Sequence, residues 1–156
     1  MQSVLSAHGP DAAIIAEISW VLIIGGTIIF AAVMAIAGYA LFGSKREVFA
    51  SKTLIVGGGI VFPVVTLSAL LVYSLVRAAA LHPEEPDALR IEVVGEQWWW
   101  RVRYPDFETA NEIRIPVGRP VRLELKSADV IHSFWVPALA GKLDMIPGRT
   151  NVLRVR

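Results

Sequence analysis

The chain has 156 residues, a formal net charge of +1, no cysteine, and a composition in which 54% of the residues are hydrophobic. Soluble domains are usually about 45–50% apolar, so the excess favours a membrane protein. Acidic and basic residues are interspersed, which argues against a nucleic-acid-binding surface. The lack of cysteine excludes disulfides and thiolate metal sites within this sequence.

Two long segments without a charged residue come first. Residues 18–42 and 53–76 carry no Asp, Glu, Lys or Arg, and each exceeds the ~20 residues that a helix needs to cross a bilayer. We therefore predict a transmembrane hairpin over residues 1–81, with spans at about 14–42 and 53–80.

The segment between the two spans is basic, with Lys45, Arg46 and Lys52. The positive-inside rule places this segment in the cytoplasm and both ends of the chain on the outer side of the membrane. A cleaved signal peptide is disfavoured because the first apolar span is too long and no Lys or Arg precedes it.

Small residues and one proline punctuate the spans. The glycines at 25–26 and 57–59 offer surfaces for close contact between helices. Pro63 is expected to kink the second span because it lacks an N–H donor.

The remainder of the chain is polar and has an alternating pattern. Residues 82–89, which include two prolines, form a predicted linker. Residues 90–156 are predicted to form a β-sandwich or barrel, because short alternating segments are separated by turn signals. The predicted strands are 90–94, 98–104, 112–117, 121–126, 130–136 and 151–156.

Two motifs in this region indicate chemistry. The first is Gly95-Glu-Gln-Trp-Trp-Trp-Arg-Val-Arg-Tyr104, and the second runs from Val130-Ile-His-Ser-Phe-Trp-Val-Pro137 into Lys142-Leu-Asp-Met-Ile-Pro-Gly-Arg149. A lone histidine on an apolar strand, such as His132, is by itself more often a hydrogen-bonded core residue than a metal ligand. Together with the two spans, however, the motifs resemble subunit II of the haem–copper respiratory oxidases.

The resemblance implies a cupredoxin-like β-sandwich after the hairpin, of which residues 90–156 are the N-terminal part. It implies a subunit that accepts electrons from cytochrome c at the outer face and passes them to the catalytic subunit I, where oxygen is reduced to water. The haems would lie in that partner, because neither span contains a histidine. The expected location is the bacterial plasma membrane or the mitochondrial inner membrane, in contact with lipid.

The resemblance also assigns roles to single residues. His132 would be a ligand of the dinuclear copper A centre, and Trp98 the exposed tryptophan of electron entry, with Trp100 more buried behind it. Surface acids would dock cytochrome c; the candidates are Glu96, Asp106, Glu108, Glu112 and Asp129. Asp144 and Arg149 would face the catalytic subunit.

The remaining copper ligands expected from the resemblance, two cysteines, a second histidine and a methionine among them, have no counterpart here. The sequence as written cannot complete a copper A centre, and a fragment of a longer subunit is the favoured explanation. Two alternatives stay open. One is a copper-free subunit of a quinol-oxidising enzyme, and the other is a membrane-anchored binding or assembly protein without a redox role.

Overall fold

The computed structural model describes residues 3–43, 51–79, 81 and 86–156. It divides into two compact units, one formed by residues 18–79 and the other by residues 1–17 together with 80–156. The basic residues Lys45 and Arg46 lie outside the described residues, as does the first half of the predicted linker, residues 82–85.

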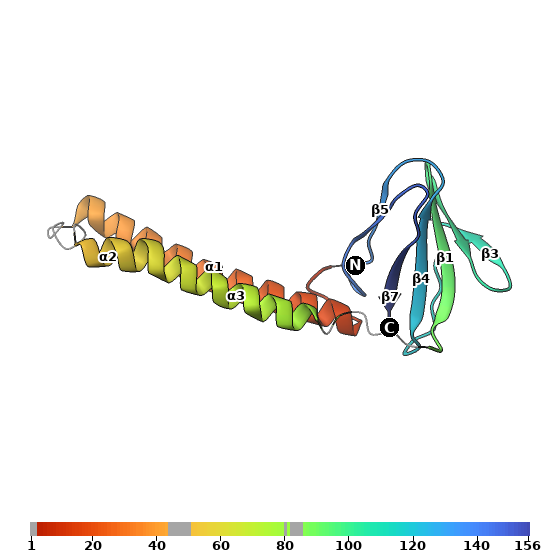
Figure 1. Cartoon of the computed structure of the whole chain (residues 1–156), viewed down its shortest axis with the longest axis horizontal. Helices are drawn as coiled ribbons and strands as arrows, with labels where there is room; N and C mark the ends of the chain where they lie inside the picture. The colour runs from red at the N-terminus through yellow and green to blue at the C-terminus, as the bar shows by residue number, and fades with distance from the viewer. Residues whose placement is uncertain (1–2, 44–50, 80, 82–85) are drawn as a thin grey trace. The chain divides into compact units, whose positions relative to one another are not determined.

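The first unit consists of long apolar helices (Figure 1). Helix α1 spans Pro10–Phe42, and a second helical stretch comprises α2 (Lys52–Val56), η2 (Gly57–Val61) and α3 (Phe62–Ala78). Both stretches, of 33 and 27 residues, are long and apolar enough to cross a membrane. None of the residues of α2, η2 or α3 is buried, so their apolar side chains are available to lipid or to a partner.

The second stretch contains a π-helical turn, η2, directly before Pro63. A proline in a helix cannot donate to the carbonyl four residues earlier, and its ring collides with that carbonyl, here the one of Gly59. A wider π turn relieves this collision. The predicted close contacts at the glycines are absent from the described residues, since a Cβ at positions 25, 26, 57, 58 or 59 would meet nothing within 4 Å.

The second unit is built on a mixed β-sheet (Figure 1). Its strands are β1 (Leu89–Glu96), β2 (Trp99–Arg103), β3 (Glu108–Ala110), β4 (Val121–Ser127) and β7 (Asn151–Val155), in the order β3-β2-β1-β4-β7. β1 pairs antiparallel with β2 and parallel with β4. A separate antiparallel ribbon is formed by β5 (His132–Phe134) and β6 (Leu143–Met145).

Side chains that alternate along the strands make the core. Ile91 and Val93 of β1 are buried, as are Leu123 and Leu125 of β4, while the residues between them are only partly buried. Phe134 and Met145 bring the ribbon into the same cluster. The predicted order, apolar membrane-type helices followed by a β domain, is confirmed.

The N-terminal residues pack on the β domain. The His8 amide donates to the Ala138 carbonyl at 2.8 Å, and the Ala12 amide donates to the Leu139 carbonyl at 3.2 Å. Asp11 and Ala12 are buried, with 6% and 1% of their surface exposed. The start of α1 is therefore an integral part of the β unit.

One predicted strand, residues 112–117, is wrong, because this segment forms no ladder. Ile113 and Ile115 do pack against the core, which accounts for the alternation in the sequence. The backbone is instead held by Tyr104, whose hydroxyl accepts from the Arg114 amide at 2.6 Å and donates to the Arg114 carbonyl at 3.0 Å. Two short strands, β3 and β6, were not predicted.

Candidate functional site

His132 opens strand β5 and lies over the inner face of the large sheet. Its side chain is only 15% exposed, and its ring meets Trp100 edge-on, with centroids 5.6 Å apart and planes at 65°. On the side of β1 it faces Gly95, where an added Cβ would stand 2.8 Å from the ring atoms Cγ and Cδ2. The imidazole is therefore enclosed by residues of β1 and β2, which lie far from it in the sequence.

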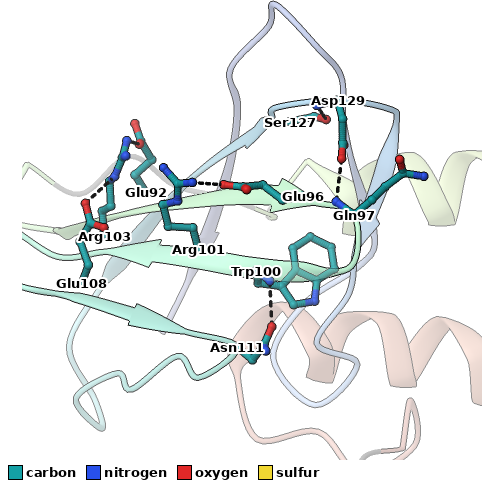
Figure 2. Close-up of polar contacts among 10 residues, drawn as sticks. All are labelled: Glu92, Glu96, Gln97, Trp100, Arg101, Arg103, Glu108, Asn111, Ser127 and Asp129. Atoms are coloured by element: carbon teal, nitrogen blue, oxygen red, sulfur yellow. Dashed lines mark hydrogen bonds and ion pairs between the residues drawn. The ribbon is translucent and has the colours of Figure 1, made fainter.

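Asp129 fixes both this ring and the neighbouring turn. Its Oδ1 lies 2.6 Å from Nε2 of His132 and accepts from the Val130 amide at 2.6 Å. Its Oδ2 accepts from the Gln97 amide at 2.6 Å, as Figure 2 shows. The His132 ring and these two backbone amides hold the pKa of Asp129 at about 2, well below its usual value of 3.8.

The tautomer of His132 follows from this contact. An ionised carboxylate only accepts hydrogen bonds, so Nε2 of His132 carries a proton and donates it. In the neutral ring Nδ1 is then the nitrogen with a free lone pair. Histidines that bind metals commonly donate their second ring N–H to a carboxylate in this way.

The three consecutive tryptophans lie in three different environments. Trp98 occupies the two-residue turn between β1 and β2, where the Gln97–Trp98 peptide bond is cis, and it is 88% exposed. Trp99 packs under the guanidinium of Arg101 at 5.3 Å on the outer face. Trp100 points inward to His132 and Phe134.

Asn111 supports Trp100 from the neighbouring loop. Its side-chain oxygen accepts from the Trp100 amide at 2.8 Å, and its own amide donates to the Trp100 carbonyl, also at 2.8 Å (Figure 2). Asn111 adopts a positive φ of 60°, a conformation that asparagine tolerates better than most residues. No pattern in the sequence signalled this role.

The outer face of the sheet carries a ladder of ion pairs that crosses the four strands β3, β2, β1 and β4, and Figure 2 shows its part around Arg103. Arg103 bonds Glu92 at 2.8 Å and Glu108 at 2.7 Å, and Lys126 also contacts Glu92. The hydrogen bond from Lys126, followed by that from Arg103, lowers the pKa of Glu92 against its desolvation. Glu108, one of the predicted docking acids, is therefore already paired with Arg103 inside the domain.

The other predicted docking acids differ in their surroundings. Glu96 pairs with Arg101 at 2.5 Å on the outer face. Glu112 pairs with Arg114 at 3.0 Å. Asp106 is exposed in the turn that follows β2. Of the predicted acids, Asp129 is the one that contacts His132.

Asp144 lies on β6 of the ribbon, and Arg149 lies in the segment that joins the ribbon to β7. Asp144 is exposed on β6, where its Oδ1 accepts from the Ser133 hydroxyl at 2.7 Å and its carbonyl accepts from Asn151 at 2.6 Å. Arg149 is exposed, and its amide donates to the Ile146 carbonyl at 3.1 Å. Arg149 therefore lies in the loop that follows the strand of Asp144, and Asp144 already has an internal partner.

A copper A centre does not fit the residues present. His132 offers one ring nitrogen, and the sequence has no cysteine to bridge two coppers. Met145, the register partner of His132, is fully buried in the core. Among the residues that the structure describes, no three His, Asp or Glu side chains converge as a metal site would require.

The architecture defines a class: a β domain carried on membrane-type helices, with a histidine–tryptophan pair next to an exposed tryptophan. Residues 107–156 match the family model described as "Cytochrome C oxidase subunit II, periplasmic domain". These 50 of the 156 residues are therefore similar to the periplasmic domain of cytochrome c oxidase subunit II.

Two relatives carry the name of the same subunit. Cytochrome c oxidase subunit 2 of Alkalihalophilus pseudofirmus is 39% identical over 99 residues, which cover 58% of this chain and 29% of that protein. The probable cytochrome c oxidase subunit 2 of Rickettsia bellii is 34% identical over 116 residues, covering 58% and 42%. The chain thus spans less than half of the length of these two relatives.

Two solved structures are similar to part of this chain. The periplasmic domain of subunit II of cytochrome oxidase from Bradyrhizobium japonicum is 35% identical, with a TM-score of 0.43 and coverage of 47% of this chain and 65% of that one. A second solved structure is a mixed disulfide between a thioredoxin-like protein and subunit II.

Proposed function

We propose that this chain acts as the electron-entry subunit of a terminal respiratory oxidase, receiving electrons from cytochrome c on the outer side of the membrane and delivering them to the catalytic subunit. The observation that carries the proposal is the exposed Trp98 at a turn that Asp129 ties to the His132 loop through the Gln97 amide. One carboxylate therefore joins a surface aromatic to an enclosed histidine.

The surface around Trp98 suits a transient protein partner. Tryptophan brings a large, rigid apolar face and is enriched among residues that dominate interfaces. Val130 and Ile131, 47% and 65% exposed, extend the apolar surface of the Asp129 loop. Acidic side chains such as Glu96 and Asp106 would steer a basic partner toward this surface.

Behind the surface, Trp100 and His132 provide an ordered aromatic contact. Their edge-on packing, the Asn111 bonds to the Trp100 backbone and the Asp129 bond to the ring all restrict motion. We assign them to the inner side of the path by which electrons leave the docking surface. No step is assigned through copper, because the residues present do not complete its site, and the haems of the reaction would belong to a partner subunit.

The membrane arrangement is part of the same proposal. Two helices long enough to span the bilayer and a β domain that matches a periplasmic family model support an outer-side domain on a bacterial plasma membrane. Asp144 and Arg149 are proposed to face the catalytic subunit.

The test is steady-state oxidation of ferrocytochrome c by the intact oxidase complex that carries Trp98→Ala. Truncation of an interface tryptophan costs about 2 kcal/mol or more, so KM should rise by about 30-fold. Val117→Ala is the matched control, because Val117 is also a fully exposed apolar residue and lies in another loop. An unchanged KM in Trp98→Ala would remove the proposed docking role.

The absence of cysteine favours one second candidate, a copper-free subunit of a quinol-oxidising enzyme. The two candidates differ in the reductant that sustains oxygen uptake by the purified complex. Turnover with a quinol but not with ferrocytochrome c would establish the second candidate. Copper bound to a longer form of this subunit would support the first.

A further inference from the structure

Gly95 occupies the inner face of β1 at the point where the His132 strand lies over the sheet. It is the register partner of Trp100 on β2 and of Ser127 on β4, and its carbonyl accepts from the Ala128 amide at 3.0 Å. Only Gly118 and Gly148 among the described glycines have a positive φ. The backbone at position 95 therefore does not itself require glycine.

Glycine inside a strand weakens the strand and commonly marks a close approach of another group. At Gly95 that group is the imidazole of His132. A Cβ built on Gly95 would lie 2.8 Å from both Cγ and Cδ2 of the ring and 3.2 Å from its Cβ. All three nearest atoms belong to this one side chain. The His132 ring therefore occupies the space that a side chain at position 95 would fill, and we call this space the Gly95 slot.

The other contacts of the ring depend on the depth of this slot. The ring centroids of Trp100 and His132 lie 5.6 Å apart, and Oδ1 of Asp129 lies 2.6 Å from Nε2 of His132. Because real Cβ contacts essentially never fall below 3.0 Å, a methyl group at position 95 would force the ring away from β1. The ring could not then keep both the Asp129 bond and the Trp100 contact.

We propose that Gly95 is the positioning residue for His132, and that it sets the place of the imidazole relative to Trp100 and Asp129. Gly95 acts through His132 and touches no reaction partner itself. The consequence for electron transfer rests on the proposed function, whereas the coupling between the two residues does not.

The coupling is tested with the full-length chain in detergent micelles, comparing the thermal midpoints of Gly95→Ala, His132→Ala and the double variant. Gly95→Ala alone should lower the midpoint by several degrees, which is the shift that a loss near 1 kcal/mol produces in a small domain. In the His132→Ala background only the Cβ contact at 3.2 Å remains, so the same change should have little effect. If Gly95→Ala does not fold by itself, recovery of folded protein in the double variant reports the same coupling.

Gly141→Ala is the matched control. Its added Cβ would meet only Cδ1 of Ile15, at an ordinary 3.5 Å, so the midpoint should stay unchanged. Equal losses from Gly95→Ala in both backgrounds, or an equal loss from Gly141→Ala, would overturn the assignment.

The functional consequence is measured in the oxidase complex. Gly95→Ala should lower kcat by about tenfold or more, since misplacement of a reacting group by about 1 Å costs up to about 100-fold. KM for cytochrome c should stay constant because Trp98 is untouched, a split that general destabilisation would not produce. If the wild-type complex does not oxidise cytochrome c, the proposed function fails, while the thermal coupling still decides the role of Gly95.

Discussion

Asp129 and His132, three residues apart, are joined by a 2.6 Å hydrogen bond between a carboxylate oxygen and ring Nε2. The same carboxylate accepts from the amides of Gln97 and Val130. It thereby connects the tryptophan turn, the loop before β5 and the histidine, which come from two distant parts of the sequence.

Asp129→Ala should loosen all three groups together. The Gln97 and Val130 amides would lose a charged acceptor, and we expect their hydrogen exchange to accelerate on the order of tenfold, because bonds to charged acceptors are the stronger ones. Exchange measured by mass spectrometry on the full chain checks this. Asp106→Ala is the control, since it removes an exposed acid from another turn, and equal acceleration there would contradict the prediction.

Glu92 should give the β domain a specific acid sensitivity. Its pKa is lowered in the folded state by hydrogen bonds from Lys126 and Arg103, from a usual value of 4.5. The associated stability is fully present above pH 4.5 and is lost as the pH falls through the lowered folded-state pKa. Glu92→Gln should therefore be less stable than the wild type at neutral pH and should lose less stability on acidification.

Thermal unfolding of the full chain at pH 7 and at successive acidic values measures this difference. Glu124→Gln is the control, because Glu124 lies on the same face of the sheet and pairs with Arg122 instead. The difference between the wild type and Glu92→Gln should shrink in high salt, since the pairs are partly exposed and screened. Parallel pH curves for the wild type and Glu92→Gln would refute the prediction.

Local pattern predicted those parts of the fold that depend on a single strand. The alternation of Val121-Arg-Leu-Glu-Leu-Lys126 correctly predicted β4, and charge-free length correctly predicted the helices. Alternation also misled, because Ile113 and Ile115 pack inward without any strand partner. The alternation shows which side chains are buried, and a ladder needs in addition a neighbouring strand with unpaired groups.

The site depended on contacts that no local pattern encodes. Alternation correctly separated Trp99 from Trp100, but the turn that exposes Trp98 lies outside the strand, where alternation does not apply. The slot at Gly95 arises only when β5 crosses β1, 37 positions away in the sequence. A glycine within an otherwise regular strand was its only signal in the sequence.

Arg149 should contribute to assembly with the catalytic subunit. It is exposed in the loop that follows β6, the strand of Asp144, whose carboxylate is already bonded to Ser133. Arginine is enriched at interfaces because its planar fork recognises carboxylates with two bonds. Arg149→Ala should therefore lower the amount of catalytic subunit that copurifies, most clearly at low salt.

Arg119→Ala provides the comparison, since Arg119 is equally exposed and lies in a turn near Gly118. Both variants remove one positive charge, so any general effect of charge appears in both. Equal copurification with the two variants would show that the Arg149 side chain does not contribute to the interface.

The β domain should depend on the N-terminal residues for its stability. Gly9 lies so close to the domain that an added Cβ would stand 2.9 Å from the Arg156 carbonyl oxygen and 3.0 Å from that of Leu139. Because both atoms belong to the backbone, they cannot move aside as a flexible side chain would. Gly9→Ala should detach residues 8–16 and expose the buried Asp11 and Ala12, which faster hydrogen exchange at Ala12 would report.

Gly38→Ala in α1 is the matched control, because its Cβ would meet nothing within 4 Å.

By the same reasoning, residues 82–156 alone should show no cooperative thermal transition. A domain of this size is near the lower limit for an independent core, and it would lack the hydrogen bonds from the His8 and Ala12 amides to its backbone. A sharp transition in residues 82–156 alone, at the midpoint of the full chain, would show that the N-terminal segment is dispensable.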